Sequence, residues 1–452
     1  MPVRLVIIGG GPGGNTAATV AATLGAEVTL IERDIIGGAA HLWDCIPSKA
    51  MIATGAELSE LTRARSMGLV AEGRLDVDAL RERVASIETH LQASVRTLLE
   101  SQGVRLIHGT GRLQGPREVI AETEAGNERL DADFVLLATG SRPRIPDWAV
   151  VDGERILTTR QAYPPQEIPA HLCVIGSGVT GVEFTHMFSA LGSQVSLVVS
   201  RQQVLPLKDA EVAAVLEEEF LTRGVKLLKG ARAKAVSRDG DTVTVDCDDG
   251  RVVKASHVVL AIGSIPNREH LGLEEAGVAL DEAGYVQVNH NCLTSVDNIY
   301  AAGDLSGKLP LSSVAAMQGR KIAEHLMGLH VRAHRHLDYE KASSAIFTEP
   351  EIADVGLAEA EAFASGRKIR VTKVPFSANA KALIKGDARG FVKIISDPAT
   401  GVVLGGSIVG RNAAELVSVI AVAVTNGLKV VDIVDSLLVH PSMSESLAEA
   451  AS

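Results

Sequence analysis

The sequence predicts an α/β protein with two Rossmann-like dinucleotide-binding domains and a further C-terminal α+β domain. Three observations predict this fold class. A glycine-rich turn between a strand and a helix occurs at residues 9–14 and again at residues 176–181. The composition, with 46% hydrophobic but only 3% aromatic residues and 43 glycines, is typical of an α/β enzyme and excludes a disordered chain. At 452 residues the chain is too long for one core, so we expect several domains.

The first glycine-rich turn has the complete context of a dinucleotide site. The elements, in order, are a strand at 5–8, the turn at 9–14, an alanine-rich helix at 15–24 and a strand at 27–31. Gly9, Gly11 and Gly14 let the backbone turn tightly and approach a pyrophosphate at the helix N-terminus. Glu32, at the end of the second strand, is placed to accept hydrogen bonds from ribose hydroxyls. This pattern predicts a first dinucleotide site.

The second turn repeats the pattern with one difference. Its elements are a strand at 172–175, the turn with Gly176, Gly178 and Gly181, a helix at 182–191 and a strand at 195–199. After this strand come Ser200 and Arg201, where an NAD-specific site would place a carboxylate. Without that carboxylate a 2′-phosphate is not repelled, and Ser200 and Arg201 can bind it. The pattern favours NADPH, or use of both cofactors, over strict NADH; alternatively, Arg201 only caps an exposed turn.

Charge, cysteine content and hydropathy exclude several classes of protein. A net charge of −11 argues against binding to nucleic acid or to anionic lipid. The four cysteines are scattered without a C-x-x-C pair, so we expect neither a disulfide framework nor a metal site. The longest apolar stretches, such as residues 416–424, are too short to span a bilayer. We expect a cytoplasmic protein without integral membrane association.

The segment 37–49, G-G-A-A-H-L-W-D-C-I-P-S-K, gives the most specific indication of chemistry. It resembles the G-G-x-C-x-x-x-x-C-I-P-S-K segment of the pyridine nucleotide-disulfide oxidoreductases, which include lipoamide dehydrogenase and glutathione reductase. In that family two cysteines pass electrons from flavin to a disulfide substrate. Here the second is Cys45, but Ala40 occupies the position of the first. Because a methyl group cannot form a disulfide, we do not expect the family's usual substrate chemistry.

Other segments extend the resemblance over almost the whole chain. They are A-T-G-S-R-P at 138–143, A-I-G-S-I-P-N at 261–267, Y-A-A-G-D at 300–304, and 346–356, 390–393 and 404–410 in the C-terminal third. The resemblance implies a glutathione reductase-like fold, with FAD at the first turn and the nicotinamide cofactor at the second. It adds to these sites Thr139, Gly140, Gly263, Gly303 and Asp304, of which Asp304 holds the ribityl chain.

The resemblance also implies a domain division. Residues 1–148 and 263–335 form the FAD-binding domain, 149–262 the NAD(P)H-binding domain and 336–452 the C-terminal dimerisation domain. Between the motifs, residues 76–102 have the apolar spacing of one long helix of the FAD domain.

The same resemblance assigns roles to five side chains. Cys45 lies against the flavin as a thiolate, because a helix beginning at this point would lower the pKa of its thiol; alternatively, it is a small apolar filler. Lys49 lies near flavin N5 with Glu183 as its ion-pair partner, unless the pair is only a buried structural salt bridge. His440 acts as acid/base on the partner subunit's substrate, and Glu445 orients it after the chain turns at an intervening proline; alternatively, the histidine is a remnant without a catalytic role.

These residues lead to one main hypothesis and three alternatives. The main one is a homodimeric flavoenzyme that passes electrons from NAD(P)H through FAD to a quinone, since A-A-H-L-W-D-C matches the G-G-A-A-x-L-x-D-C variant of lipoamide-dehydrogenase-like quinone reductases. The second is a dihydrolipoamide dehydrogenase or other disulfide reductase, against which Ala40 argues. The third is a soluble transhydrogenase, or an oxidase or peroxidase that uses Cys45 as a sulfenic acid. The fourth is a flavin-binding sensor with little turnover.

Overall fold

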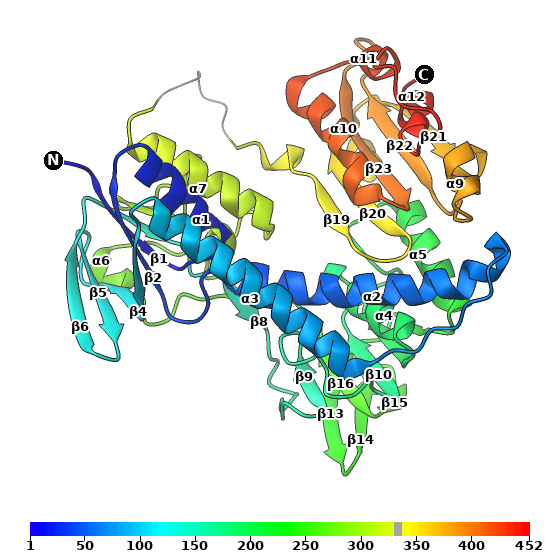
Figure 1. Ribbon diagram of the computed structural model, residues 1–452, viewed down its shortest axis with the longest axis horizontal. Coiled ribbons are helices and arrows are strands. Elements are labelled where there is room, and N and C mark those ends of the chain that lie inside the picture. Colours follow the sequence, from blue (N-terminus) through cyan, green and yellow to red (C-terminus); the bar gives the residue numbers. More distant parts are fainter. Residues whose placement is uncertain (330–336) are drawn as a thin grey trace. The chain divides into compact units, whose positions relative to one another are not determined.

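The computed structural model describes residues 1–329 and 337–452 and divides into two compact units (Figure 1). The first unit comprises Met1–Pro47, Glu82–Pro143 and Ser264–Tyr339, and the second comprises Ser48–Arg81, Arg144–Gly263 and Glu340–Ser452. The domain boundary expected between residues 335 and 336 lies outside the described residues. Within the described ranges, every helix is too short or too polar to cross a bilayer.

The first unit is built on a parallel five-stranded sheet in the order β18-β7-β1-β2-β3. Its strands are β1 (Arg4–Ile8), β2 (Glu27–Glu32), β3 (Arg105–His108), β7 (Phe134–Leu137) and β18 (Ile299–Ala301). Smaller antiparallel sheets join β4 (Thr110–Leu113), β5 (Glu118–Thr123) and β6 (Gly126–Asp131), and β8 (Ser141–Pro143) with β17 (Ser264–Pro266). Helices α1 (Pro12–Thr23) and α7 (Ser312–Leu326) pack together beside the parallel sheet. The short α6 (Leu273–Ala276) also belongs to this unit.

The second unit contains another parallel sheet, in the order β12-β11-β10-β16-β9. Its strands are β9 (Ile156–Thr158), β10 (His171–Ile175), β11 (Gln194–Val199), β12 (Lys226–Lys229) and β16 (His257–Leu260). An antiparallel sheet of β13 (Ala233–Asp239), β14 (Thr242–Cys247) and β15 (Val252–Ala255) accompanies it, with helices α4 (Val179–Ala190) and α5 (Ala210–Thr222). This is the second dinucleotide fold that the sequence predicts.

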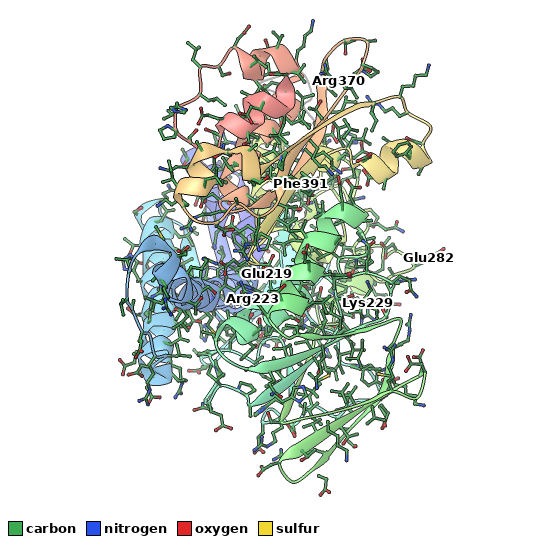
Figure 2. The ribbon with its side chains drawn as sticks, turned by 90° about the vertical axis from the view of Figure 1, so that its right-hand side faces the viewer. Glu219, Arg223, Lys229, Glu282, Arg370 and Phe391 are labelled. Atoms are coloured by element: carbon green, nitrogen blue, oxygen red, sulfur yellow. The ribbon has the colours of Figure 1, made fainter. Side chains whose placement is uncertain are left out.

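The C-terminal part of the second unit is an antiparallel sheet with helices, in the order β19-β20-β23-β22-β21. The strands are β19 (Ser344–Ile346), β20 (Glu351–Gly356), β21 (Arg370–Pro375), β22 (Phe391–Ser396) and β23 (Val403–Gly410). The helices are α8 (Glu359–Ala364), α9 (Ala380–Ile384), α10 (Ala413–Asn426), α11 (Val430–Val434) and α12 (Glu445–Ala451). Figure 2 labels Phe391 at the start of β22, and Glu219 and Arg223 on α5 and directly after it. Helix α10 packs on β20 and β23, which confirms an α+β third part.

Two long helices connect these parts along the chain. Helix α2 (Ile46–Arg63) follows a π-helical turn, η1 (Ala40–Cys45), and α3 (Val77–Ser101) agrees with the helix predicted at 76–102. The boundary between the units falls within both helices, after Pro47 in α2 and after Arg81 in α3. Most of α3 therefore belongs to the first unit.

Candidate active site

The first glycine-rich turn follows β1 at the carboxyl edge of its sheet. Gly9 has φ +109°, and a Cβ on Gly14 would lie 2.0 Å from the carbonyl oxygen of Gly9, so both positions require glycine. At Gly11 a Cβ would meet only the Cα of Gly38, at 3.9 Å. The internal packing therefore does not require glycine at position 11, where a ligand's pyrophosphate can approach the start of α1. The residues present fit an adenine dinucleotide.

The carboxylate of Glu32 is fixed at the end of β2. Its Oε2 accepts a hydrogen bond from the backbone N–H of Gly10 at 2.7 Å, and its Oε1 accepts one from the N–H of Asp34 at 2.8 Å. The carboxylate is thus held beside the glycine turn, where the sequence places the ribose-binding acid.

The loop that contains Asp304 is tied to the first crossing segment. The hydroxyl of Ser141 donates to Oδ2 of Asp304 at 2.5 Å, and the backbone N–H of Gly303 donates to Oε1 of the buried Gln318 at 2.7 Å. Sequence reasoning missed both contacts. Ser141 lies in the A-T-G-S-R-P segment at 138–143, but the resemblance assigns it no role. Gln318, on α7, belongs to none of the recognised motifs.

Two further predicted cofactor residues lie close to this loop in the first unit. The hydroxyl of Thr139 donates to the carbonyl of Asn267 at 2.7 Å, and the side-chain amide of Asn267 donates back to the carbonyl of Thr139 at 2.9 Å. Gly140 has φ +68°, and a Cβ added there would meet no protein atom within 4 Å, so its surroundings leave space. The two crossing segments are therefore joined beside Asp304.

The second glycine-rich turn repeats these constraints in the second unit. A Cβ on Gly181 would lie 1.9 Å from the carbonyl oxygen of Gly176, whereas one on Gly178 would meet nothing within 4 Å. Ser200 and Arg201 are exposed directly after β11. The loop that carries them folds back onto the turn, where the N–H of Leu205 donates to the carbonyl of Ser177 at 2.8 Å.

Gly263, at the return crossing, has φ +95°, and its carbonyl accepts a hydrogen bond from the N–H of Arg144 at 2.9 Å. A Cβ at Gly263 would meet no atom within 4 Å. The glycine is thus required by its backbone conformation and not by packing.

Lys49 and Glu183 form an ion pair within the second unit. Lys49 Nζ, on α2, lies 2.8 Å from Oε2 of Glu183, on α4, whose side chain is only 6% exposed. The other carboxylate oxygen accepts the backbone N–H of Phe347 at 2.9 Å, and Nζ lies 5.1 Å from the centre of the Phe347 ring. Phe347 thus contacts both members of the pair. Its place in the 346–356 motif was the one sign of this role in the sequence.

Cys45 lies where a π-helical turn meets an α-helix. Cys45 is half-buried and is the last residue of η1, which continues directly into α2. The α-helix itself begins at Ile46, directly after Cys45, where the sequence predicts a helix start. The π-helical turn before it was not expected from the sequence.

His440 and Glu445 form the dyad that the spacing predicts. Nδ1 of His440 lies 2.7 Å from Oε1 of Glu445, and the other oxygen accepts the N–H of Ser442 at 2.9 Å. Hydrogen bonds from Ser442 and then from His440 lower the pKa of Glu445. The imidazole is 75% exposed, and Nδ1 bonded to the carboxylate leaves Nε2 as the nitrogen that can exchange a proton with a ligand.

Comparisons with known proteins agree with this architecture. Residues 3–319 match the family model described as pyridine nucleotide-disulphide oxidoreductase, and residues 342–451 match the dimerisation domain of the same family. The chain belongs to the pyridine nucleotide-disulphide oxidoreductases. It is accordingly an oxidoreductase that uses FAD and NAD(P)H, as its two dinucleotide folds indicate.

Individual relatives in the family cover the chain almost completely. A protein named NAD(P)H dehydrogenase (quinone) from Mycobacterium tuberculosis is 43% identical over 100% of this chain and 94% of its own length. A dihydrolipoyl dehydrogenase from Zymomonas mobilis is 35% identical over 99% of this chain and 96% of its own length. The crystal structure of LpdA from M. tuberculosis superposes with a TM-score of 0.95 at 43% identity, covering 99% of both chains.

A solved structure of the HOCl-induced flavoprotein disulfide reductase RclA from Escherichia coli is also similar. It matches with a TM-score of 0.88 at 25% identity and covers 99% of both chains. Proteins of this fold therefore include one named for a quinone and another named as a disulfide reductase.

Proposed function

We propose that this oxidoreductase passes electrons from NAD(P)H to a quinone and not to a disulfide. The proposal rests on the number of cysteine thiols near the predicted redox site and on their exposure. Ala40 stands where the family has a redox cysteine, and Cys173, Cys247 and Cys292 are at most 1% exposed. Burial also raises the pKa of all three thiols, which makes them poor nucleophiles. The other three thiols are thus inaccessible to a disulfide substrate, and the 43% identical quinone dehydrogenase supports a quinone acceptor.

FAD, when bound, would accept two electrons from the nicotinamide and release them to the acceptor. The residues of this chain hold and polarise the ligands. Glu32 binds the ribose, Asp304 the ribityl chain, and Lys49 supplies positive charge that Glu183 keeps in place. A quinone also needs a proton on reduction, and His440, oriented by Glu445, is our proposed source.

We further propose a homodimer in the cytoplasm, with His440 acting on the acceptor of the partner subunit. The match to the family's dimerisation domain supports association. So do apolar side chains beside His440, because Leu437 is 92% exposed and Val439 is 73% exposed. The domain division at 148/149, 262/263 and 335/336 remains part of the same proposal.

Cofactor choice follows from the second turn. Ser200 and Arg201 are exposed where a 2′-phosphate would lie, and no carboxylate stands at that end of β11. Changing Arg201→Ala is expected to raise the KM for NADPH about tenfold, the loss of one charge-assisted contact, with the KM for NADH unchanged. Steady-state kinetics with both cofactors measure this. An equal rise for both would show that Arg201 does not recognise the phosphate.

The experiment that tests the acceptor is anaerobic stopped-flow reduction of the holoenzyme by NADPH and by NADH, followed by a chase. Reoxidation by benzoquinone and none by oxidised lipoamide is expected. Reoxidation by lipoamide would contradict the proposal and require another thiol. A Cys45→Ser variant separates peroxide chemistry, which needs the thiol, from quinone reduction, which should survive the change.

A further inference from the structure

The Lys49–Glu183 pair is held by a short segment of the C-terminal part, residues 347–349, which we call the strap. At one end of the strap the N–H of Phe347 bonds to Glu183 and the Phe347 ring lies near Lys49. Between the ends, the hydroxyl of the buried Thr348 donates to the carbonyl of Pro350 at 2.7 Å. The contacts that fix the other end of the strap therefore also help to fix the position of the Lys49–Glu183 ion pair.

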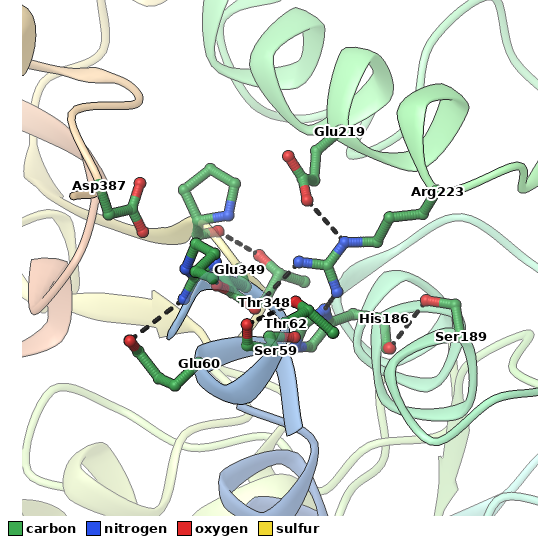
Figure 3. Close-up of polar contacts among 12 residues, drawn as sticks. Ser59, Glu60, Thr62, His186, Ser189, Glu219, Arg223, Thr348, Glu349 and Asp387 are labelled. Carbon is green, nitrogen blue, oxygen red and sulfur yellow. Dashed lines mark hydrogen bonds and ion pairs between the residues drawn. The ribbon is translucent and has the colours of Figure 1, made fainter. Parts of the chain in front are cut away.

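The other end of the strap, Glu349, is bound by three arginines from separate elements. Oε1 accepts hydrogen bonds from Arg63, the last residue of α2, and from Arg389 at 3.0 Å, just before β22. Oε2 accepts one from Arg223, directly after α5, at 2.9 Å. The Glu349 side chain is 13% exposed. Figure 3 shows Arg223 extending towards Glu349 and Glu219, and Glu219 is the second acceptor of the same guanidinium.

The electrostatics show that Glu349 is a buried anion. Burial alone would raise the pKa of Glu349, but hydrogen bonds from Arg223 and Arg63 outweigh it and lower the pKa to about 2. Glu349 is therefore ionised at neutral pH, where it can bind all three arginines as an anion.

Helix α4 contacts the strap network at a second point, one turn beyond Glu183. His186 is 1% exposed, and its Nδ1 lies 3.5 Å from Nη1 of Arg223, which must be the donor. Burial and then the charge of Arg223 lower the pKa of His186 to about 3, so the ring is neutral and can accept this bond. Glu183 thus binds Phe347 at one end of the strap. His186 binds Arg223, which in turn holds Glu349 at the other end.

We propose that Glu349 is a positioning residue for the Lys49–Glu183 pair and acts through Phe347. This inference rests on the proposed function, in which that pair promotes reduction of the flavin by NAD(P)H. Glu349 does not touch the pair. It anchors the strap, so that the Phe347 N–H stays on Glu183 and the Phe347 ring stays against Lys49.

The test compares Glu349→Gln with a matched control, Glu219→Gln. The Glu219 side chain is 14% exposed and binds Arg223 and Arg389, two of the arginines that hold Glu349, but it lies outside the strap. The measured quantity is the rate of flavin reduction by NADPH in single-turnover stopped flow of the holoenzyme, with the melting temperature as the measure of structural loss. We expect Glu349→Gln to slow reduction about tenfold or more, as ångström-scale misplacement does, and Glu219→Gln to change it less than about twofold.

A double-mutant cycle with Lys49→Met distinguishes positioning from a general structural effect. If Glu349 acts through the pair, Glu349→Gln slows reduction in the wild-type background and has no further effect in the Lys49→Met background, while its effect on the melting temperature persists in both. Equal slowing in both backgrounds, or equal slowing by Glu219→Gln, would overturn the inference.

Two outcomes keep this inference separate from the proposed function. If Lys49→Met itself leaves flavin reduction unchanged, the proposed role of the pair fails and the inference fails with it. If Lys49→Met slows reduction but Glu349→Gln does not, only the inference fails. Should Glu349→Gln not fold, Glu349→Asp keeps the charge but shortens the side chain by one methylene, and it is expected to slow reduction by a smaller factor through the same cycle.

Discussion

Lys393 offers the sharpest test of the packing in the second unit. Its side chain, on β22, is fully buried, and Nζ lies 2.5 Å from Asp209, 2.8 Å from Glu211 and 3.1 Å from Glu359. Burial alone would lower the pKa of Lys393, but hydrogen bonds to Asp209 and Glu211 outweigh it and raise the pKa. The ammonium is therefore charged, and each of its three protons has a carboxylate to bind.

Replacing Lys393 with Met removes the cation and leaves the carboxylates. Glu211 keeps a second partner, Lys373 at 2.6 Å, and Glu359 is 31% exposed, but Asp209 is only 8% exposed. Leaving one buried charge without its partner costs about 3–5 kcal/mol. At about 2 °C per kcal/mol for a cooperative unit of this size, the melting temperature should fall by roughly 6–10 °C.

The assay is thermal unfolding followed by circular dichroism at fixed protein concentration, with Lys393→Met/Asp209→Asn as the second variant. Because the double variant no longer buries an unpaired charge, it should melt above Lys393→Met. If the double variant melted at or below the single one, the reasoning from the buried charge would be refuted. Lys373→Met, whose side chain is 49% exposed, is the control and should shift the melting temperature by about 2 °C or less.

Three further predictions concern single contacts. Because the pKa of Glu349 is lowered, ionised Glu349 stabilises the folded state fully above about pH 4.5, and this stabilisation is lost as the pH falls towards 2. The difference in melting temperature between wild type and Glu349→Gln should therefore shrink between pH 7 and pH 3.5. A constant difference would contradict this. Ser141→Ala removes the 2.5 Å bond to Asp304 and should weaken FAD binding to the apoprotein about tenfold by fluorescence titration, whereas unchanged affinity would show that this bond does not prepare the site. Gly55→Ala should lower the melting temperature despite the better helix propensity of alanine, because the new Cβ would lie 2.9 Å from the Cβ of Ala190; a rise would mean that α2 and α4 separate at no cost.

The features that the sequence predicted well are those encoded locally. Gly14 and Gly181 must be glycine because each approaches a carbonyl five residues earlier in the chain, so the turn, the helix after it and the strand before it appear together in the sequence. The dyad of His440 and Glu445 is similarly local. For this reason both dinucleotide folds and the His440–Glu445 contact could be predicted without coordinates.

The features that the sequence could not predict depend on distant partners. Lys393 and Asp209 are 184 residues apart, and Glu349 and Arg63 are 286 apart, so nothing near either residue marks it as buried. Charged residues are ordinarily expected at the surface, and that expectation is wrong for Lys393, Asp209 and Glu349, whose side chains are at most 13% exposed. The π-helical turn that ends at Cys45 was missed for another reason. Proline at position 47 is typical of a first helical turn, and no local signal revealed the π-helical turn before it.

Helix α2 also sets a constraint on chain length. It carries Lys49 near its start, Gly55 against Ala190 of α4, and Arg63 on Glu349 at its end. With a rise of 1.5 Å per residue, Lys49 and Arg63 are about 21 Å apart along the axis, and one inserted residue would turn Arg63 by about 100°. The length of the helix and the rotation of its residues about the axis therefore fix how far apart these contacts lie and in which direction each side chain points. Insertions and deletions should be tolerated at residues 68–76, which precede α3 and belong to no helix or strand, but not between residues 49 and 63, a pattern that a scan of single-residue insertions would reveal.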